Sequence, residues 1–245
     1  MGIHRITISP SFAFANTFNS PSNTNYNDLI ITFSKNPPIP WNVKVKNNLE
    51  SRIGVYQIIN SEGTTIYVGK ATGDMGLKGR HTTHEKREYF RLFDATTITT
   101  YYAEDPNFND PGILILLERI LVYGEQAVLN KDVTEGIPTE YTVASKMLEK
   151  IKCISDELHF KWEASKDDEF LAESEAFDDI YQELEKNMNS TKKAELEFNH
   201  AIKYHNSEKK LIRDKKKIYK SNFKLLRQSV KSRIKSVNDK YEELI

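Results

Sequence analysis

The stretch GVYQIINSEGTTIYV, from Gly54 to Val68, decides the fold of this chain. Its two ends, Gly54–Ile59 and Thr64–Val68, are rich in β-branched and aromatic residues, which favour strands. Between them lies Asn60-Ser61-Glu62-Gly63, a run of turn-forming residues that ends in glycine. Two strand-forming runs joined by so short a polar loop predict a β-hairpin.

The residues that follow the hairpin alternate between helical and strand-like patterns. They indicate, in order, a glycine-rich loop, a helix, a third strand and a second helix: Gly69–Gly79, Arg80–Leu92, Thr96–Tyr102 and Ile113–Tyr123. Pro111 suits the start of the last helix, because its fixed φ matches the first helical turn. The order β-β-α-β-α, closing at Val128-Leu129-Asn130, predicts a compact α/β (α+β) domain over residues 52–135.

Residues 1–51 have a different character and are expected to form an N-terminal extension. They are rich in Asn, Ser and Pro, and only Arg5–Ile8 and Leu29–Phe33 have the pattern of short strands. The proline-containing run Asn36–Pro40 separates this extension from the domain that begins near Arg52. The first residues lack the basic start and long apolar run of a secretory signal.

Residues 136–245 predict a long helical region, since the pattern is helical from about Ala144 and no proline follows Pro138. Towards the C-terminus apolar side chains recur mostly every three or four positions, at Tyr219, Phe223, Leu226, Val230, Ile234, Val237, Tyr241 and Leu244. This spacing is typical of a coiled-coil seam. Two arrangements stay open, an antiparallel hairpin within one chain and a homodimer of two chains.

The charge of the chain is zero overall but unevenly placed. Residues 156–200 hold 14 acidic and 5 basic side chains, a net −9, whereas residues 201–245 hold 14 basic and 5 acidic, a net +9. The domain over 52–135 has 9 basic and 12 acidic side chains, a net −3. A neutral average therefore does not argue against nucleic-acid binding, because the basic charge is concentrated at the C-terminus.

Composition excludes several classes of protein. No run of 18 apolar residues is present, so we expect no membrane span. The single cysteine, Cys153, excludes an internal disulfide and any multi-cysteine zinc module. A reducing, cytoplasmic setting fits these features best.

Residue types suited to phosphate chemistry occur in order within the 52–135 domain. They are the tripeptides Gly54-Val55-Tyr56 and Tyr67-Val68-Gly69, then Lys70, Arg80, His84, Glu118 and Asn130. Arg80 and His84 are four residues apart, which places both on one face of the predicted helix. This set, in this order, resembles the GIY-YIG endonuclease superfamily over about a third of the chain. Valine stands in the middle of both tripeptides, a conservative departure from the family pattern.

The resemblance implies hydrolysis of DNA phosphodiester bonds with one bound divalent metal ion, Mg²⁺ or Mn²⁺. A divalent cation neutralises the charge that the phosphate gains in the transition state. Glu118 is the candidate metal ligand, because an anionic oxygen suits Mg²⁺, which keeps most of its waters. A carboxylate at this position could instead pair with Arg119 or turn to solvent.

Four residues are candidates for binding and activating the reactants. Arg80 offers a permanently charged fork for phosphate oxygens. The resemblance implies that one tyrosine, Tyr56 in preference to Tyr67, activates or orients the attacking water. A phenol with a pKa near 10 needs help in that role, which Lys70 or the metal could give. The structural alternatives are a surface salt bridge for Arg80 and plain buried strand residues for the tyrosines.

Two residues are expected to support the site. His84 is a candidate for proton transfer or phosphate contact, with an ordinary surface histidine as the alternative. Asn130 is expected to brace the site by bonding loop backbone or Glu118 rather than by contacting the metal. His81 has no counterpart in the family pattern.

DNA affinity is expected to come from outside the slightly acidic domain. Six basic residues near the C-terminus are the candidates: Lys209, Lys210, Arg213, Lys215, Lys216 and Lys217. Their charges would release counterions from DNA and give sequence-independent affinity. The alternative is a solvated coiled-coil face that pairs with the acidic residues 156–200.

These features together predict a restriction-like or mobile-element-like endonuclease, and the resemblance implies a 5′-phosphate product. A second class stays open, a non-catalytic DNA-binding or regulatory protein of the same fold with a coiled-coil interaction arm. A third is a scaffold whose function lies in the coiled coil. The presence of both tyrosines, Arg80 and Glu118 favours the enzyme, because a degenerate copy is expected to lose one of them.

Overall fold

The computed structural model describes residues 2–8, 29–41, 49–82, 86–103 and 110–244. Its fold is mixed α/β, an antiparallel sheet followed by helices. The chain divides into two compact units. Unit 1 comprises Met1–Glu85 and Asp94–Thr134, and unit 2 comprises Lys86–Phe93 and Glu135–Ile245.

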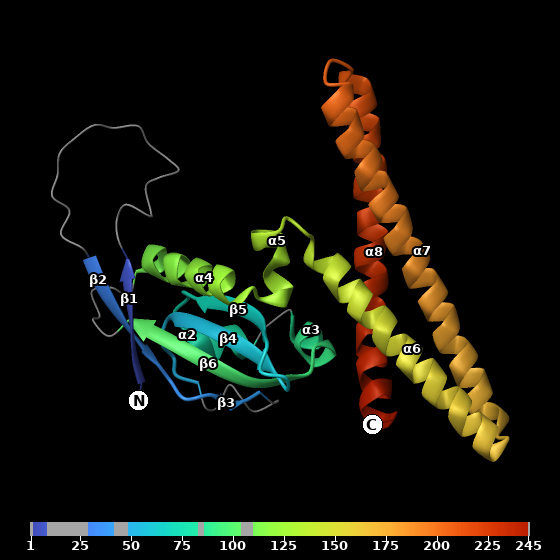
Figure 1. Cartoon of the computed structure of the whole chain (residues 1–245), viewed down its shortest axis with the longest axis horizontal. Coiled ribbons are helices and arrows are strands. Elements are labelled where there is room, and N and C mark those ends of the chain that lie inside the picture. The colour runs from blue at the N-terminus through green and yellow to red at the C-terminus, as the bar shows by residue number, and fades with distance from the viewer. Residues whose placement is uncertain (1, 9–28, 42–48, 83–85, 104–109, 245) are drawn as a thin grey trace. The chain divides into compact units, whose positions relative to one another are not determined.

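In its described residues, unit 1 is built on one antiparallel sheet of six strands. The strands are β1 (Gly2–Ile8), β2 (Leu29–Lys35), β3 (Ile39–Pro40), β4 (Gly54–Asn60), β5 (Thr65–Ala71) and β6 (Ala95–Ala103). They lie in the order β1-β2-β6-β4-β5, with β3 also paired to β6 (Figure 1). β5 therefore forms one edge of the sheet, and β4 lies between β5 and β6.

The hairpin predicted from Gly54 to Val68 is confirmed as β4 and β5. In its turn the Asn60 side chain accepts hydrogen bonds from the backbone N–H groups of Glu62 and Thr64, at 3.1 and 2.8 Å. Gly63 has a φ of +78°, which glycine adopts without strain. β5 is longer than predicted, because the chain stays extended as far as Ala71 before it enters the glycine-rich loop.

Helix α4 (Pro111–Glu125) covers one face of the sheet (Figure 1). Asp110 caps the helix by accepting a hydrogen bond from the Gly112 N–H at 2.7 Å, and Pro111 occupies the first turn as predicted. The 3₁₀ turn η3 (Val128–Asn130) and the short α5 (Lys131–Thr134) follow. The core between helix and sheet consists of Phe33, Val55, Val68, Tyr101, Ala103, Leu114, Leu117, Val122 and Ala127.

The single helix predicted over Arg80–Leu92 is wrong in extent. The chain forms α2 (Gly76–Thr82) and α3 (Arg87–Leu92), which belong to different units. α2 begins earlier than predicted, at Gly76, whose φ is +51°. A side chain there would lie 2.2 Å from the Arg52 carbonyl oxygen, so glycine is required both for the torsion and for the close approach.

The N-terminal strands belong to the same sheet as the hairpin. β1 and β2 confirm the two strands expected at Arg5–Ile8 and Leu29–Phe33, and both are longer. β2 pairs with β6 from Phe33 to Lys35, and β3 pairs with β6 at Ile39 and Pro40. Residues before Arg52 therefore supply strands to unit 1, where a separate extension was expected.

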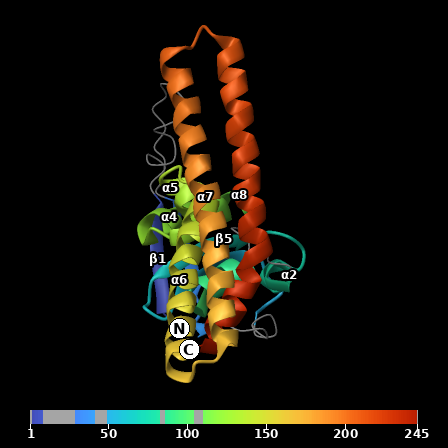
Figure 2. The same cartoon turned by 90° about the vertical axis from the view of Figure 1, so that its right-hand side faces the viewer.

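In its described residues, unit 2 consists of α3 and three long helices, α6 (Thr139–Ser165), α7 (Asp168–Tyr204) and α8 (Lys209–Leu244). α7 and α8 run antiparallel, side by side, and α6 packs against both (Figures 1 and 2). The turn from α6 to α7 uses Lys166, with a φ of +58°, and the N-cap Asp167. The helical region predicted from Ala144 is confirmed and begins slightly earlier.

Helix α3 is held on α8 by polar contacts. Arg91 lies 2.9 Å from the Asp239 carboxylate and 2.8 Å from Glu242. Asn238 donates a hydrogen bond to the Glu88 carbonyl oxygen at 2.9 Å. The hydrogen bond to Glu242 is the largest of the factors that raise the pKa of Arg91. A short helix from the middle of the chain is thereby part of the C-terminal helical unit.

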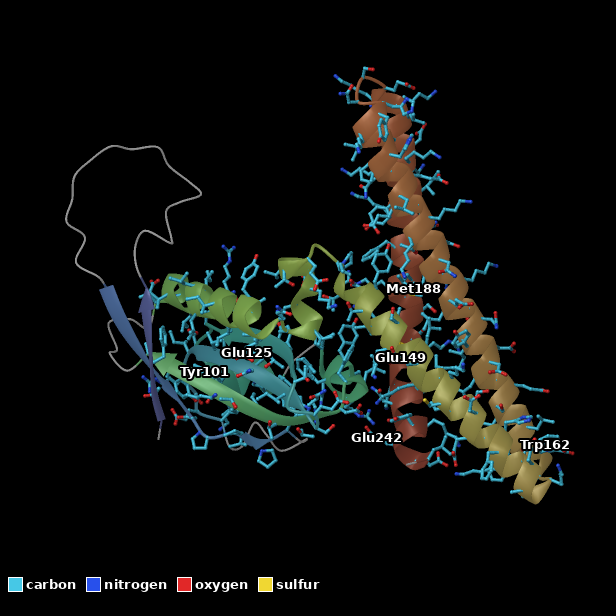
Figure 3. All side chains as sticks on the ribbon, in the orientation of Figure 1. Tyr101, Glu125, Glu149, Trp162, Met188 and Glu242 are labelled. Carbon is cyan, nitrogen blue, oxygen red and sulfur yellow. The ribbon has the colours of Figure 1, made fainter. Side chains whose placement is uncertain are left out.

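The apolar seam predicted for the C-terminal region packs within the chain. Leu226, Val230, Ile234 and Val237 are buried. Figure 3 labels Met188 on α7, whose sulfur lies 3.8 Å from Ser145 Oγ of α6. Of the two arrangements that the sequence left open, the structure shows the antiparallel hairpin within one chain. The homodimer stays a prediction. None of the described helices has the length and apolar character that crossing a membrane requires.

Candidate active site

The hairpin register brings the two tripeptides opposite each other. Tyr56 on β4 pairs with Gly69 on β5, and Ile58 pairs with Tyr67, so both tyrosines lie on the same face of the sheet. The ring centroids of the two tyrosines are 5.9 Å apart. Tyr56 is fully buried and Tyr67 nearly so. Two motifs separated in sequence by the turn therefore form one cluster.

Gly69 leaves room for this tyrosine pair. A methyl group built on Gly69 would lie 2.5 Å from the Tyr56 hydroxyl oxygen and 2.7 Å from Tyr67 Cε1. Both distances are far shorter than the separation at which non-bonded atoms attract. The glycine of Tyr67-Val68-Gly69 is thus required by the close approach of two aromatic rings.

We expect Gly69→Ala to lower the free energy of unfolding by about 1–3 kcal/mol, the usual cost of overpacking a core. Urea unfolding followed by circular dichroism measures the loss. Gly73→Ala is the matched control, because no described atom beyond its chain neighbours lies within 4 Å of a methyl group built there. The control should change the free energy by less than about 0.5 kcal/mol. Equal stability of the two variants would contradict the packing role of Gly69.

Arg80 reaches the tyrosine pair from α2. This helix is fixed to the start of β4, because the Leu77 N–H donates a hydrogen bond to the Arg52 carbonyl oxygen at 3.0 Å. From this position the Arg80 guanidinium interacts with the hydroxyls of Tyr56 and Tyr67 and favours their ionised forms. Three of the residues predicted for the site, from two strands and one helix, therefore meet at one point.

Burial controls ionisation in this cluster. It raises the pKa of the Tyr56 phenol well above its ordinary value of 10, and Arg80 offsets only part of that rise. Burial also raises the pKa of Tyr67, where Arg80 opposes the rise and Glu118 reinforces it. Burial lowers the pKa of Arg80, but its interactions with the two phenols outweigh that effect and raise it overall. At neutral pH the cluster is two neutral phenols around a cation.

Glu118 on α4 pairs with Lys70 on the edge strand β5. The Lys70 Nζ to Glu118 Oε2 distance is 2.5 Å, and the Glu118 side chain is 19% exposed. The ion pair that Glu118 makes is thus with Lys70 rather than with Arg119. Because the negative charge of Glu118 also raises the pKa of Tyr67, the carboxylate lies within electrostatic range of the tyrosine pair.

The donor chemistry at Glu118 suits a hard divalent cation. A partly exposed carboxylate provides an anionic oxygen ligand, and Mg²⁺ commonly takes one or two carboxylates while it keeps several waters. Lys70 is the cation with which such an ion would compete. Among the described residues, no three or more His, Cys, Asp and Glu side chains gather into a metal-binding group. Glu118 would therefore act together with water and substrate oxygens.

Asn130 in η3 braces the edge strand. Its Oδ1 accepts a hydrogen bond from the Val68 N–H at 2.9 Å, and its Nδ2 donates to the Val68 carbonyl oxygen at 3.0 Å. The side chain thus satisfies outward-facing backbone groups of β5 between Tyr67 and Gly69. The sequence predicts a bracing residue here, and the braced element is the strand rather than a loop or Glu118.

A chain of hydrogen bonds ties β6, β4, β5 and α4 together. The Tyr101 hydroxyl donates to Gln57 Oε1 at 2.8 Å, and Gln57 Nε2 donates to Thr65 Oγ1 at 2.5 Å. Thr65 Oγ1 in turn donates to Glu125 Oε2 at 3.1 Å. Figure 3 labels the two ends of this chain, Tyr101 and Glu125. These bonds fix the strands that carry the tyrosine pair.

Two histidines, His81 and His84, lie close to Arg80 in the sequence. His84 lies outside the described residues. His81, which sequence reasoning did not assign, is buried against Tyr56, with ring centroids 4.5 Å apart, and against Trp41 at 5.5 Å. Burial, and then the charge of Arg80, lowers the pKa of His81 to about 4, so its imidazole is neutral at physiological pH. Its adjacency to Arg80 is the one sequence feature that could have indicated it.

A pocket of about 550 Å³ opens beside the two cations Lys70 and Arg80. Its wall is the loop between β5 and α2, including Gly73, and the carboxylate of Asp74 also lines it. Sequence reasoning did not select Asp74, because a lone exposed acid in a loop carries no distinctive pattern. Both cations therefore line a pocket that is open to solvent.

The six basic residues predicted for DNA binding lie on α8, in unit 2. Lys215 is half-buried, and its Nζ lies 2.7 Å from Glu197 Oε2 on α7. The other five are exposed: Lys209, Lys210, Arg213, Lys216 and Lys217. One of the six predicted residues, Lys215, is therefore already paired with a carboxylate of the same chain.

Comparisons of the chain with protein-family models, with curated proteins and with solved structures find no match. The resemblance to GIY-YIG nucleases therefore rests on the residues of the sequence.

Proposed function

We propose that this chain is a divalent-metal-dependent endonuclease of the GIY-YIG type that hydrolyses phosphodiester bonds in DNA. The observation that supports it best is the meeting of Arg80 with the hydroxyls of Tyr56 and Tyr67. Glu118 and Lys70 lie at the same strand edge. A fixed cation, two phenols and a carboxylate in one place match the needs of a reaction that builds negative charge on phosphate.

Arg80 and Lys70 would bind the substrate. The Arg80 guanidinium presents several donors in a planar fork, which fits two oxygens of one phosphate. Its interactions with the tyrosine hydroxyls would orient that fork before charge develops on the phosphate. Lys70 lines the same pocket and adds a second positive charge.

The tyrosines would orient the water. Attack by the water oxygen forms a new bond to phosphorus and breaks the bond to the 3′ oxygen, which leaves a 5′-phosphate. The water loses a proton in this step, and the departing oxygen gains one. Because burial keeps the Tyr56 phenol protonated, its role is to position the water by hydrogen bonding. Glu118 would hold one Mg²⁺ or Mn²⁺, which when bound supplies Lewis-acid stabilisation of the phosphate charge.

The proposal is tested by incubating the purified full-length protein with supercoiled plasmid DNA. We expect nicked or linear product with Mg²⁺ or Mn²⁺ and none in excess chelator, and the ratio of the two products distinguishes nicking from double-strand cutting. Heat-denatured protein controls for contaminating ions. Undiminished cutting in chelator would contradict the metal-dependent reaction. DNA binding without cutting in either metal would instead favour the non-catalytic DNA-binding or regulatory protein.

The proposed setting is restriction or a mobile element. Some repair nucleases of the superfamily carry zinc modules, and one cysteine cannot supply such a module here.

A further inference from the structure

Helix α8 carries a regular row of basic side chains. From Lys209 to Lys235 it holds 12 basic residues and a single acid, Asp214. Eight of the basic residues recur at steps of three or four: Lys210, Arg213, Lys217, Lys220, Lys224, Arg227, Lys231 and Lys235. We refer to these eight as the basic stripe.

The basic stripe occupies one side of α8. At about 100° per residue, its members fall within an arc of about 100° around the helix axis. With a rise of 1.5 Å per residue, the stripe runs for roughly 37 Å along the helix. Positive charge on this side is thus continuous over several helical turns.

The acidic helix α7 pairs with a different side of α8. Lys215 binds Glu197 at 2.7 Å, and Arg233 binds Glu183 at 3.2 Å. By the same helical geometry, Lys215 and Arg233 lie about 120° or more from the centre of the stripe. The sequence left open the alternative that the acids of α7 neutralise the basic charge of α8. The basic residues that pair with α7, Lys215 and Arg233, are not members of the stripe.

The stripe is exposed and almost entirely without acidic partners. All eight residues are exposed, and Arg227 alone among them makes an ion pair in the described part of the chain, with Glu140 at 3.2 Å. Exposed polar residues such as Ser221 and Gln228 border the stripe. No apolar row runs through it, so it lacks the seam that a partner helix would need.

We propose that the basic stripe, a surface of unit 2 distinct from the candidate active site of unit 1, binds the sugar–phosphate backbone of duplex DNA. This inference rests on the proposed function, which makes DNA the substrate. Lysine dominates the stripe, and a lysine ammonium attracts phosphate as a point charge without reading bases. The contact adds affinity by releasing counterions, and it is independent of sequence.

The test is salt-dependent DNA binding by the full-length protein. The probe is a fluorescent 30-base-pair duplex of mixed sequence, and chelator is present so that the duplex is not cut. One variant neutralises the stripe with Lys217→Gln, Lys220→Gln, Lys224→Gln and Lys231→Gln. The matched control removes the same charge elsewhere on unit 2 with Lys152→Gln, Lys161→Gln, Lys186→Gln and Lys193→Gln.

We expect the stripe variant to flatten the slope of log affinity against log salt concentration by about 2–4, because each phosphate contact contributes about 0.9 to that slope. The control should change it by less than about 1. Circular dichroism verifies folding. A second stripe variant, with Lys210→Gln, Arg213→Gln and Lys235→Gln, should change the slope in the same direction. It keeps the proposal testable if the first variant does not fold.

Equal slopes for the stripe and control variants would overturn the proposal. A stripe variant that keeps its slope but changes its mass in light scattering would also overturn it, because the stripe would then bind a second copy of the chain. The outcome is separable from the proposed nuclease activity. Plasmid cutting without a difference in slope defeats the stripe alone, whereas a difference in slope without cutting supports the stripe and defeats the nuclease.

Discussion

Replacing Glu118 with glutamine is expected to abolish cleavage of plasmid DNA in Mg²⁺ and to leave DNA affinity unchanged. Glutamine keeps the size of the side chain on α4 but removes the anionic oxygen that a hard divalent cation requires. Single-turnover cutting, with protein in excess over plasmid, measures the loss. Fluorescence anisotropy in chelator measures affinity separately, because binding then proceeds without chemistry.

Glu125→Gln is the matched control for this variant. It makes the same chemical change on the same helix, at a carboxylate that accepts a hydrogen bond from Thr65 at 3.1 Å. Glutamine can still accept that bond, so wild-type cutting is expected. If Glu118→Gln cuts as fast as this control, the carboxylate of Glu118 does not serve the reaction.

Arg80→Ala and Tyr56→Phe are each expected to slow single-turnover cutting by about 100-fold or more. Loss of the guanidinium removes a preorganised donor to the charged phosphate, and such donors are worth about that factor. Tyr56→Phe removes one hydroxyl and keeps the buried ring, so it tests the positioning of the water with little cost in packing. Losses of similar size follow removal of acid–base or water-orienting groups.

Two further substitutions test whether loss of any positive charge on α2, or of any tyrosine hydroxyl, is enough to slow cutting. Lys78→Ala removes a positive charge from the same helix α2, and Tyr123→Phe removes the hydroxyl of an exposed tyrosine. Both should cut at rates within a few-fold of wild type. Near-wild-type cutting by Arg80→Ala and Tyr56→Phe, with folding verified, would place the active site elsewhere.

Local elements were largely predictable from the sequence, because their causes are local. The hairpin follows from β-branched runs around Asn60–Gly63, and the Asn60 side chain supplies the turn's hydrogen bonds. The start of α4 follows from Asp110 and Pro111. Where one helix was predicted over Arg80–Leu92, two form, and the first begins early at Gly76, which is fixed by its contact with Arg52, a neighbour distant in sequence.

The site was predictable as a set of residues but not as a geometry. Nothing in the sequence shows that the Tyr56 ring lies too close to residue 69 for any side chain there. Nor does it show that Lys70 pairs with Glu118, which is 48 residues away in the sequence. His81 escaped prediction for the same reason, because its contacts with Tyr56 and Trp41 arise only when α2 is placed on the sheet. Periodicity gives the faces of elements, whereas tertiary packing decides which faces meet.

The placement of α3 in the helical unit bears on any dissection of this protein. The chain leaves unit 1 after α2, contributes α3 to unit 2, and returns to form β6. A fragment that ends at Thr134 would carry the buried side chains of Phe90 and Leu92 without the helices that α3 packs against. After proteolysis near Gly136, the C-terminal helices would still contact α3 through the ion pairs of Arg91 with Asp239 and Glu242. Each unit is built from two separate stretches of the chain, so cleavage near Gly136 would leave α3 on one product and its packing partners α6 and α8 on the other.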